Sequence, residues 1–174
     1  ERIRAQLPPA ACRAKGRHVA ICTSLLRFPE SAYYEYFRPE KAVIVAYGAG
    51  SGGSGARHGL AIHHLQAYGG DWSRLAKSVT RLAHKLFRRA ASHPLLADAS
   101  LRERFLADIP EMVRLVVQAE HYMENHPPGC LLLGTTELMF TRVLALAARR
   151  RAIPVICLQH GVIALEESYM PVFA

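Results

Sequence analysis

The sequence predicts an α/β protein with a Rossmann-like parallel sheet flanked by helices. Residues 129–161 read as strand, helix and strand within about thirty residues, the span of one parallel βαβ unit. Two short apolar runs rich in β-branched residues, at 18–23 and 41–47, are typical of further buried strands. Hydrophobic residues make up 51% of the chain and charged residues 21%, which indicates a folded globular protein.

The length fits one domain with a full core and is too short for two, because the chain has 174 residues. We expect a basic lead-in over residues 1–16, a Rossmann-like domain over 17–161 and the start of an interdomain linker over 162–174. The apolar ending carries no turn signal. We therefore expect a second domain that is absent from this chain.

A loop of almost pure glycine and serine, residues 48–55, follows the second predicted strand. Gly48, Gly50 and Gly53 match the spacing of a dinucleotide-binding fingerprint, between a strand and a possible helix over 57–68. No strand ending in an acidic residue follows about twenty residues later, as that fingerprint requires. The composition favours a mobile loop that orders over a ligand. A dinucleotide remains the alternative.

The first long helix is predicted to begin after an N-cap at Asp71 and to run to about residue 91. Apolar residues recur along it at helical spacing and form its expected core stripe: Leu75, Val79, Leu82 and Leu86. A neighbouring stripe is basic: Arg74, Lys77, Arg81, Lys85 and Arg88. That stripe is either a solvated face or a surface for anionic headgroups or a phosphorylated partner.

A second long helix is predicted from an N-cap at Ser100 to about Asn125. Pro110 lies inside it and should kink or split it, because proline lacks an amide hydrogen. Farther along, Thr135 and Thr136 begin the helix of the βαβ unit, where a threonine side chain caps free amides. The same helix start is able to bind an anion.

His160 is the strongest candidate for chemistry. It follows an apolar strand and precedes Gly161, and ligands gather at the carboxyl ends of parallel strands. An imidazole there accepts a proton from a hydroxyl or, when charged, holds a phosphate. The sequence contains no paired metal-ligand spacing, so we expect no metal.

The net charge and the cysteine spacing limit which partners and which cellular compartment we expect. The net charge is +8, but no motif interleaves aromatic and basic residues in the way of nucleic-acid-binding proteins, so we expect no nucleic acid. The four cysteines are far apart, which indicates reduced thiols in the cytoplasm. No apolar run approaches the ~20 residues needed to cross a bilayer.

The stretch LLLGTTELMFTRVLALAARRRAIPVICLQHG resembles the end of the N-terminal domain in bacterial surface-polysaccharide glycosyltransferases of GT-B architecture. The similar group includes capsule polysaccharide, polysialic acid and CDP-glycerol (teichoic acid) transferases. The match is a strand, a helix of small and basic residues, and then Ile153-Pro154 through Gln159-His160-Gly161. The chain would then be one half of a GT-B fold.

The resemblance implies that His160 is catalytic, as a general base or as a donor to the leaving phosphate. It places Gln159, Gly161, Thr135 and Thr136 along the substrate cleft. The implied partners are a nucleotide-activated donor and a saccharide or lipid-linked acceptor, with peripheral contact at the anionic inner face of the cell membrane. The donor would bind the missing domain as a substrate, so no cofactor is expected, and only the full-length protein would be active. The alternatives are a non-catalytic phosphate- or nucleotide-binding module and a dinucleotide-dependent enzyme that uses the glycine-rich loop.

Overall fold

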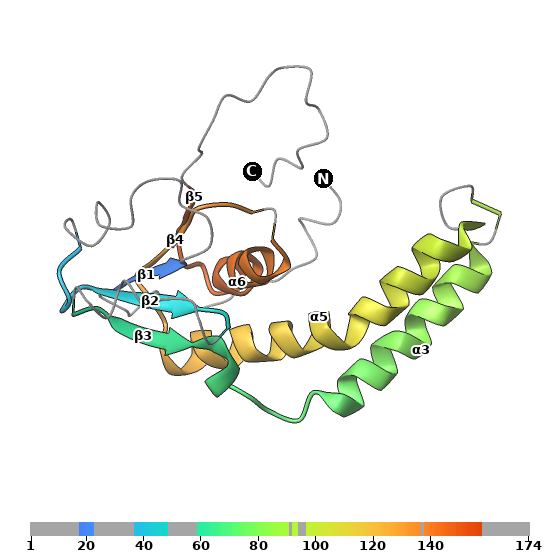
Figure 1. Ribbon diagram of the computed structural model, residues 1–174, viewed down its shortest axis with the longest axis horizontal. Coiled ribbons are helices and arrows are strands. Elements are labelled where there is room, and N and C mark those ends of the chain that lie inside the picture. Colours follow the sequence, from blue (N-terminus) through green and yellow to red (C-terminus); the bar gives the residue numbers. More distant parts are fainter. Residues whose placement is uncertain are drawn as a thin grey trace, which may run out of the picture.

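The computed structural model describes residues 18–22, 37–48, 59–90, 92–93, 97–136 and 138–157. Five parallel strands form one sheet in the order β3-β2-β1-β4-β5, which confirms the predicted α/β, Rossmann-like fold class (Figure 1). The strands are β1 (Val19–Cys22), β2 (Ala42–Ala46), β3 (Ala61–His64), β4 (Cys130–Leu133) and β5 (Val155–Cys157). The helices are the 3-10 turn η2 (Leu65–Ala67), α3 (Ser73–Arg89), α5 (Ala99–Asn125) and α6 (Met139–Arg150).

The sheet reverses its strand order between β1 and β4. Val19 of β1 is in register with Ala42 of β2 on one side and with Cys130 of β4 on the other. From this pair the chain adds β2 and β3 outward in one direction and β5 in the other. Such a reversal is the topological switch point of an open parallel sheet.

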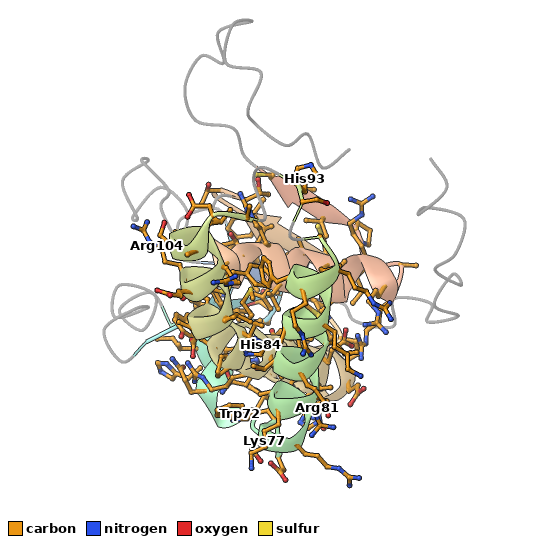
Figure 2. The ribbon with its side chains drawn as sticks, turned by 90° about the vertical axis from the view of Figure 1, so that its right-hand side faces the viewer. Trp72, Lys77, Arg81, His84, His93 and Arg104 are labelled. Carbon is orange, nitrogen blue, oxygen red and sulfur yellow. The ribbon has the colours of Figure 1, made fainter. Side chains whose placement is uncertain are left out.

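The helix α3 and the first half of α5 form a helical hairpin, defined here as residues 73–113. It projects away from the sheet on the side to which the strand arrows point (Figure 1). Its two helices lie side by side, with Lys77 and His84 labelled on α3 and Arg104 on α5 (Figure 2). α5 is continuous through Pro110 and bends along its length, in agreement with the kink expected at a proline.

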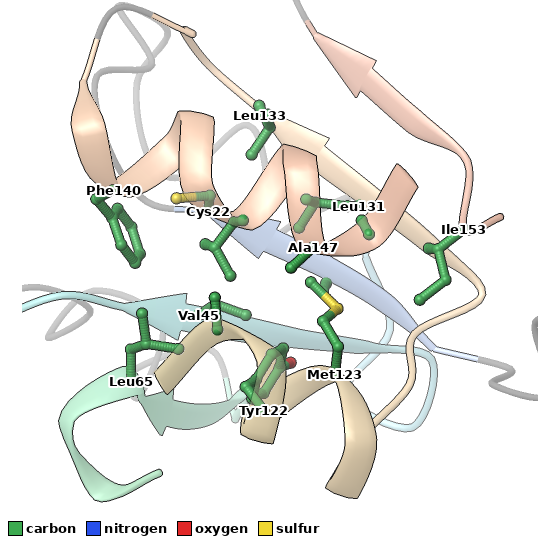
Figure 3. Close-up of a cluster of buried hydrophobic side chains, with 14 of the residues drawn as sticks. Cys22, Val45, Leu65, Tyr122, Met123, Leu131, Leu133, Phe140, Ala147 and Ile153 are labelled. Carbon is green, nitrogen blue, oxygen red and sulfur yellow. The ribbon is translucent and has the colours of Figure 1, made fainter. Parts of the chain in front are cut away.

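The main core lies between one face of the sheet and the helices α5 and α6 (Figure 3). Alternate residues of each strand point to this face, because successive side chains of a strand point to opposite sides. Buried side chains of this core come from β2, β4, α5 and α6, among them Val45, Leu131, Leu133, Tyr122, Met123, Phe140 and Leu144, and Leu65 of η2 adds to them. The intervening strand residues, Ile21, Ile44 and Leu132, form a second buried cluster on the other face.

The predicted core stripe of α3 is wrong for three of its four residues. Of that stripe only Val79 packs in the hairpin core, whereas Leu75, Leu82 and Leu86 are exposed. α3 instead buries the residues one position later in the chain, Ala76, Ala83 and Phe87. Two apolar stripes therefore run side by side on α3, and the stripe that contains Ala76 and Ala83 faces α5, because alanine permits close approach of the two helices.

Several predicted element boundaries also require correction. Residues 57–68 do not form the predicted helix, because the part described contains β3 and η2. The cap of α5 is Asp98, whose carboxylate accepts from the amides of Ser100 and Leu101, so Ser100 is not the N-cap. The N-cap of α3 is Trp72 and not Asp71 as predicted, although the Asp71 carboxylate accepts from the amide of Ser73 at 3.0 Å. None of the described helices is long and apolar enough to cross a bilayer.

Candidate functional site

The candidate site lies at the carboxyl edge of the sheet. We use this term for Tyr47 and Gly48 after β2, Thr135 and Thr136 after β4, and Cys157 at the end of β5. Leu133 and Cys157 are in register, so β4 and β5 end at the same level. Because β4 borders the switch point, Thr135 lies where open parallel sheets bind their ligands.

The two threonines do not cap α6, contrary to the sequence prediction. The helix begins at Met139, and its N-cap is Leu138, whose side chain makes no capping hydrogen bond. Thr135 is buried and Thr136 is half-buried. Arg142 of α6 reaches back, and its Nε donates to the carbonyl oxygen of Thr136 at 2.6 Å. A guanidinium and the start of α6 therefore lie beside the carboxyl edge, and both favour anionic groups.

A groove of about 710 Å³ runs from this point between α6 and β5. Thr136, Arg142 and Cys157 lie at one end of its lining, and Arg149 adds a second guanidinium. Most of the remaining lining is aliphatic, including Leu146. Desolvation raises the pKa of the Cys157 thiol, so the sulfur is protonated near neutral pH and is a poor nucleophile. The groove suits a ligand that combines an apolar body with an anionic group.

Three side chains that the sequence analysis did not single out connect α5 to the carboxyl edge. The hydroxyl of Tyr47 donates to the carboxylate of Glu111. Arg114 binds the same carboxylate through Nε at 2.8 Å and Nη2 at 2.6 Å, and Nη2 also lies 2.9 Å from the Tyr47 hydroxyl. Tyr47 stacks on Phe140 of α6, with ring centroids 5.2 Å apart.

The hydrogen bonds of this Tyr47–Glu111–Arg114 cluster hold Tyr47 against α5. Hydrogen bonds from Arg114 lower the pKa of Glu111, and the hydrogen bond to Glu111 raises the pKa of Tyr47. Glu111 is therefore ionised and fully engaged, which makes it a poor general base. The spacing of Glu111 and Arg114, three residues apart on a helix, was visible in the sequence. Their contact with Tyr47 was not.

The proposed catalytic residue His160, together with Gln159 and Gly161, lies outside the described residues. Gly50 and Gly53 of the glycine-rich loop also lie outside them. Gly48 is described, and its φ of +94° suits glycine at the end of β2. The next described element is β3, so no helix start of the kind that the dinucleotide fingerprint requires is found in residues 59–64.

Comparison of the chain with models of protein families, with curated proteins and with solved structures finds no match. Its fold and the arrangement of its residues therefore carry the functional argument. Within the part of the chain that the structure describes, no three His, Cys, Asp or Glu side chains are grouped to hold a metal ion.

A cluster of aromatic rings lies between β3 and the end of α5. His63 of β3 packs against His126 and Tyr122, with ring centroids 4.7 Å and 5.8 Å apart. Burial, and then the nearby His126 and His18, lower the pKa of His63, so its imidazole is neutral at pH 7. Tyr122 belongs to the main core, so we assign the cluster to the border of that core.

Proposed function

We propose that this chain supplies the acceptor-side domain of a cytoplasmic GT-B glycosyltransferase. The full protein would transfer a nucleotide-activated sugar or polyol phosphate to a cell-surface polysaccharide acceptor. The observation that carries the proposal is the unit β4–α6–β5, in which β5 ends at the carboxyl edge beside β4. The chain continues from Cys157 to the Gln159-His160-Gly161 motif, which resembles the motif at this position in such transferases.

In the proposed reaction His160 accepts the proton of the acceptor hydroxyl. The acceptor oxygen forms the new bond to the transferred group, while the bond from that group to the nucleotide phosphate breaks and the phosphate leaves with the electron pair. A histidine suits this role because its pKa lies near neutral. The Thr135 and Thr136 hydroxyls would bind the acceptor, and Arg142 would offset the negative charge of the phosphate.

The dinucleotide alternative has less support. A dinucleotide fingerprint joins a strand to a helix at the switch point. Here Gly48 follows β2, which is one strand away from the switch point, and the next described elements are β3 and η2. A non-catalytic phosphate-binding module keeps one supporting observation, the groove lined by Arg142 and Arg149.

The decisive variant is His160→Ala in the complete gene product, with sugar transfer measured from a panel of nucleotide-activated donors. We expect a loss of about 10²-fold or more, the typical contribution of a positioned acid–base group. The matched control is His93→Ala, because His93 is exposed beyond the end of α3. Circular dichroism of both variants checks folding.

Unchanged transfer in the folded His160→Ala variant would contradict the proposed role of His160. Binding of nucleotides without transfer by the wild-type protein would favour the non-catalytic module. Saturable binding of NAD(P) at micromolar concentration would instead support the dinucleotide enzyme.

A further inference from the structure

The hairpin exposes large apolar side chains along both of its helices. Five of them are between 44% and 63% exposed; they are Leu75, Leu82, Leu86, Leu101 and Phe105. The three leucines of α3 recur at spacings of seven and four, and Leu101 and Phe105 are four apart, so each set follows one stripe of its helix. We call these five residues the apolar face.

The two stripes lie on the same side of the hairpin. On α3 each exposed leucine directly precedes a buried residue, such as Leu86 before Phe87, and on α5 Phe105 directly precedes the inward Leu106. The same turn of about 100° in two antiparallel helices brings both stripes to one side of the pair. The rings of Phe87 and Phe105 meet edge to face, 5.6 Å between centroids, and join the stripes.

The charge of the hairpin is concentrated on α3. This helix contains six basic residues and no acidic residue: Arg74, Lys77, Arg81, Lys85, Arg88 and Arg89. None of the six makes an ion pair with an acidic side chain of the described residues. Three of them immediately precede the exposed leucines, in the pairs Arg74-Leu75, Arg81-Leu82 and Lys85-Leu86. A basic stripe therefore borders the apolar face.

The first half of α5 adds no positive charge. Its Arg102 and Arg104 are outweighed by Glu103, Asp108 and Glu111. On the side away from the leucines, a groove of about 750 Å³ is lined by Lys77, Arg81, His84 and Arg88 of α3 (Figure 2). The hairpin thus has positive potential on both sides of α3, which attracts an anionic surface from a distance.

We propose that the apolar face of the hairpin docks on an anionic lipid bilayer. Leucine and phenylalanine would enter the boundary between headgroups and acyl chains, and the bordering lysines and arginines would pair with lipid phosphates. Charge argues against a second copy as the occupant, since two α3 helices would bring twelve positive charges together. Nucleic acid would leave the leucines in water. The proposal does not depend on the proposed function.

The test is co-sedimentation of this chain with vesicles of phosphatidylcholine, with or without phosphatidylglycerol. We expect binding to the anionic vesicles, weaker binding to the neutral ones, and release by salt. The variant Leu82→Gln/Leu86→Gln keeps good helix formers and should reduce partition into anionic vesicles about tenfold or more. The control is Ile156→Gln on β5, where a comparably accessible apolar side chain (51% exposed) outside the hairpin should have no effect.

A second variant, Arg74→Gln/Lys85→Gln, should weaken binding to anionic vesicles and leave the weak neutral binding unchanged. Circular dichroism checks that each variant is folded. Absence of vesicle binding by the wild-type chain overturns the proposal. Full binding by the folded leucine variant also overturns it, because the docking surface would then lie elsewhere. Preferential binding of DNA over anionic vesicles would show a polyanion site instead.

Discussion

Leu144 on α6 and Leu82 on α3 are the same residue type in the middle of amphipathic helices. Leu144 is 0% exposed and Leu82 is 63% exposed. Around Leu144 the helix packs on the sheet, whose broad surface needs large side chains to fill the space above it. Around Leu82 the helix packs on another helix through Ala76 and Ala83, and the leucine is left outside.

The difference separates stability from surface chemistry. The sheet with its two covering helices holds most of the large buried side chains, so it should determine the free energy of unfolding. The hairpin has a small core, and the leucines of α3 lie on the outside, next to the six basic residues of this helix. A stripe of leucines usually indicates the side of a helix that faces the core, but on α3 this stripe is exposed.

The largest expected effect is a difference in the free energy of unfolding between two leucine-to-alanine variants, one in each region. Leu144→Ala should lower the free energy of unfolding by about 3 kcal/mol, because it opens a cavity in the main core. Leu82→Ala should change it by less than about 0.5 kcal/mol, because the side chain already contacts water. Urea unfolding of both variants, followed by circular dichroism, measures the difference. Equal losses would mean that the leucine on α3 is buried in solution.

A smaller effect, of opposite sign for the two residues, is expected for the hydroxyls of Tyr47 and Tyr122. Tyr47→Phe removes the hydrogen bond to Glu111 and should cost about 1 kcal/mol. Tyr122 is buried in the main core, and its hydroxyl has no hydrogen-bond partner among the described residues. Tyr122→Phe should therefore be neutral or stabilising by up to about 1 kcal/mol. A loss of stability in Tyr122→Phe would reveal a partner for that hydroxyl.

The smallest effect is on the acid side of the stability profile. The lowered pKa of Glu111 stabilises the fold above its ordinary value of 4.5, and this stabilisation is lost as the pH falls through the lowered pKa. The contribution should stay under about 1 kcal/mol, because the carboxylate is partly exposed. The stability advantage of the wild type over Glu111→Gln should therefore shrink on acidification below pH 4.5. Glu103→Gln, on the exposed side of α5, should show no such convergence.

Sequence patterns located four of the five strands because their apolar runs are bounded by turns or prolines. β3 was missed because it is a short edge strand, Ala61–His64, with two histidines and exposed ends. The stripe of α3 was misassigned because two apolar stripes lie one residue apart, and only packing against α5 selects between them. Asp98 was missed as a cap because Ser100 is an equally common capping residue.

Only those parts of the candidate site that depend on residues close together in the sequence could be predicted. Thr135 and Thr136 follow β4 directly, so the βαβ pattern was enough to place them at the carboxyl edge. Tyr47 and Glu111 are 64 residues apart, and their contact depends on how α5 crosses the sheet. The role of Gln159, His160 and Gly161 remains a prediction from sequence.

The length of α5 connects the exposed end of the hairpin to the sheet. It is one uninterrupted helix of 27 residues, which corresponds to a rod of roughly 40 Å. One end carries Leu101 and Phe105, and the other leads into β4. A contact at the far end of α5 is therefore connected to Thr135 and Thr136 through one helix, the short segment 126–129 and β4.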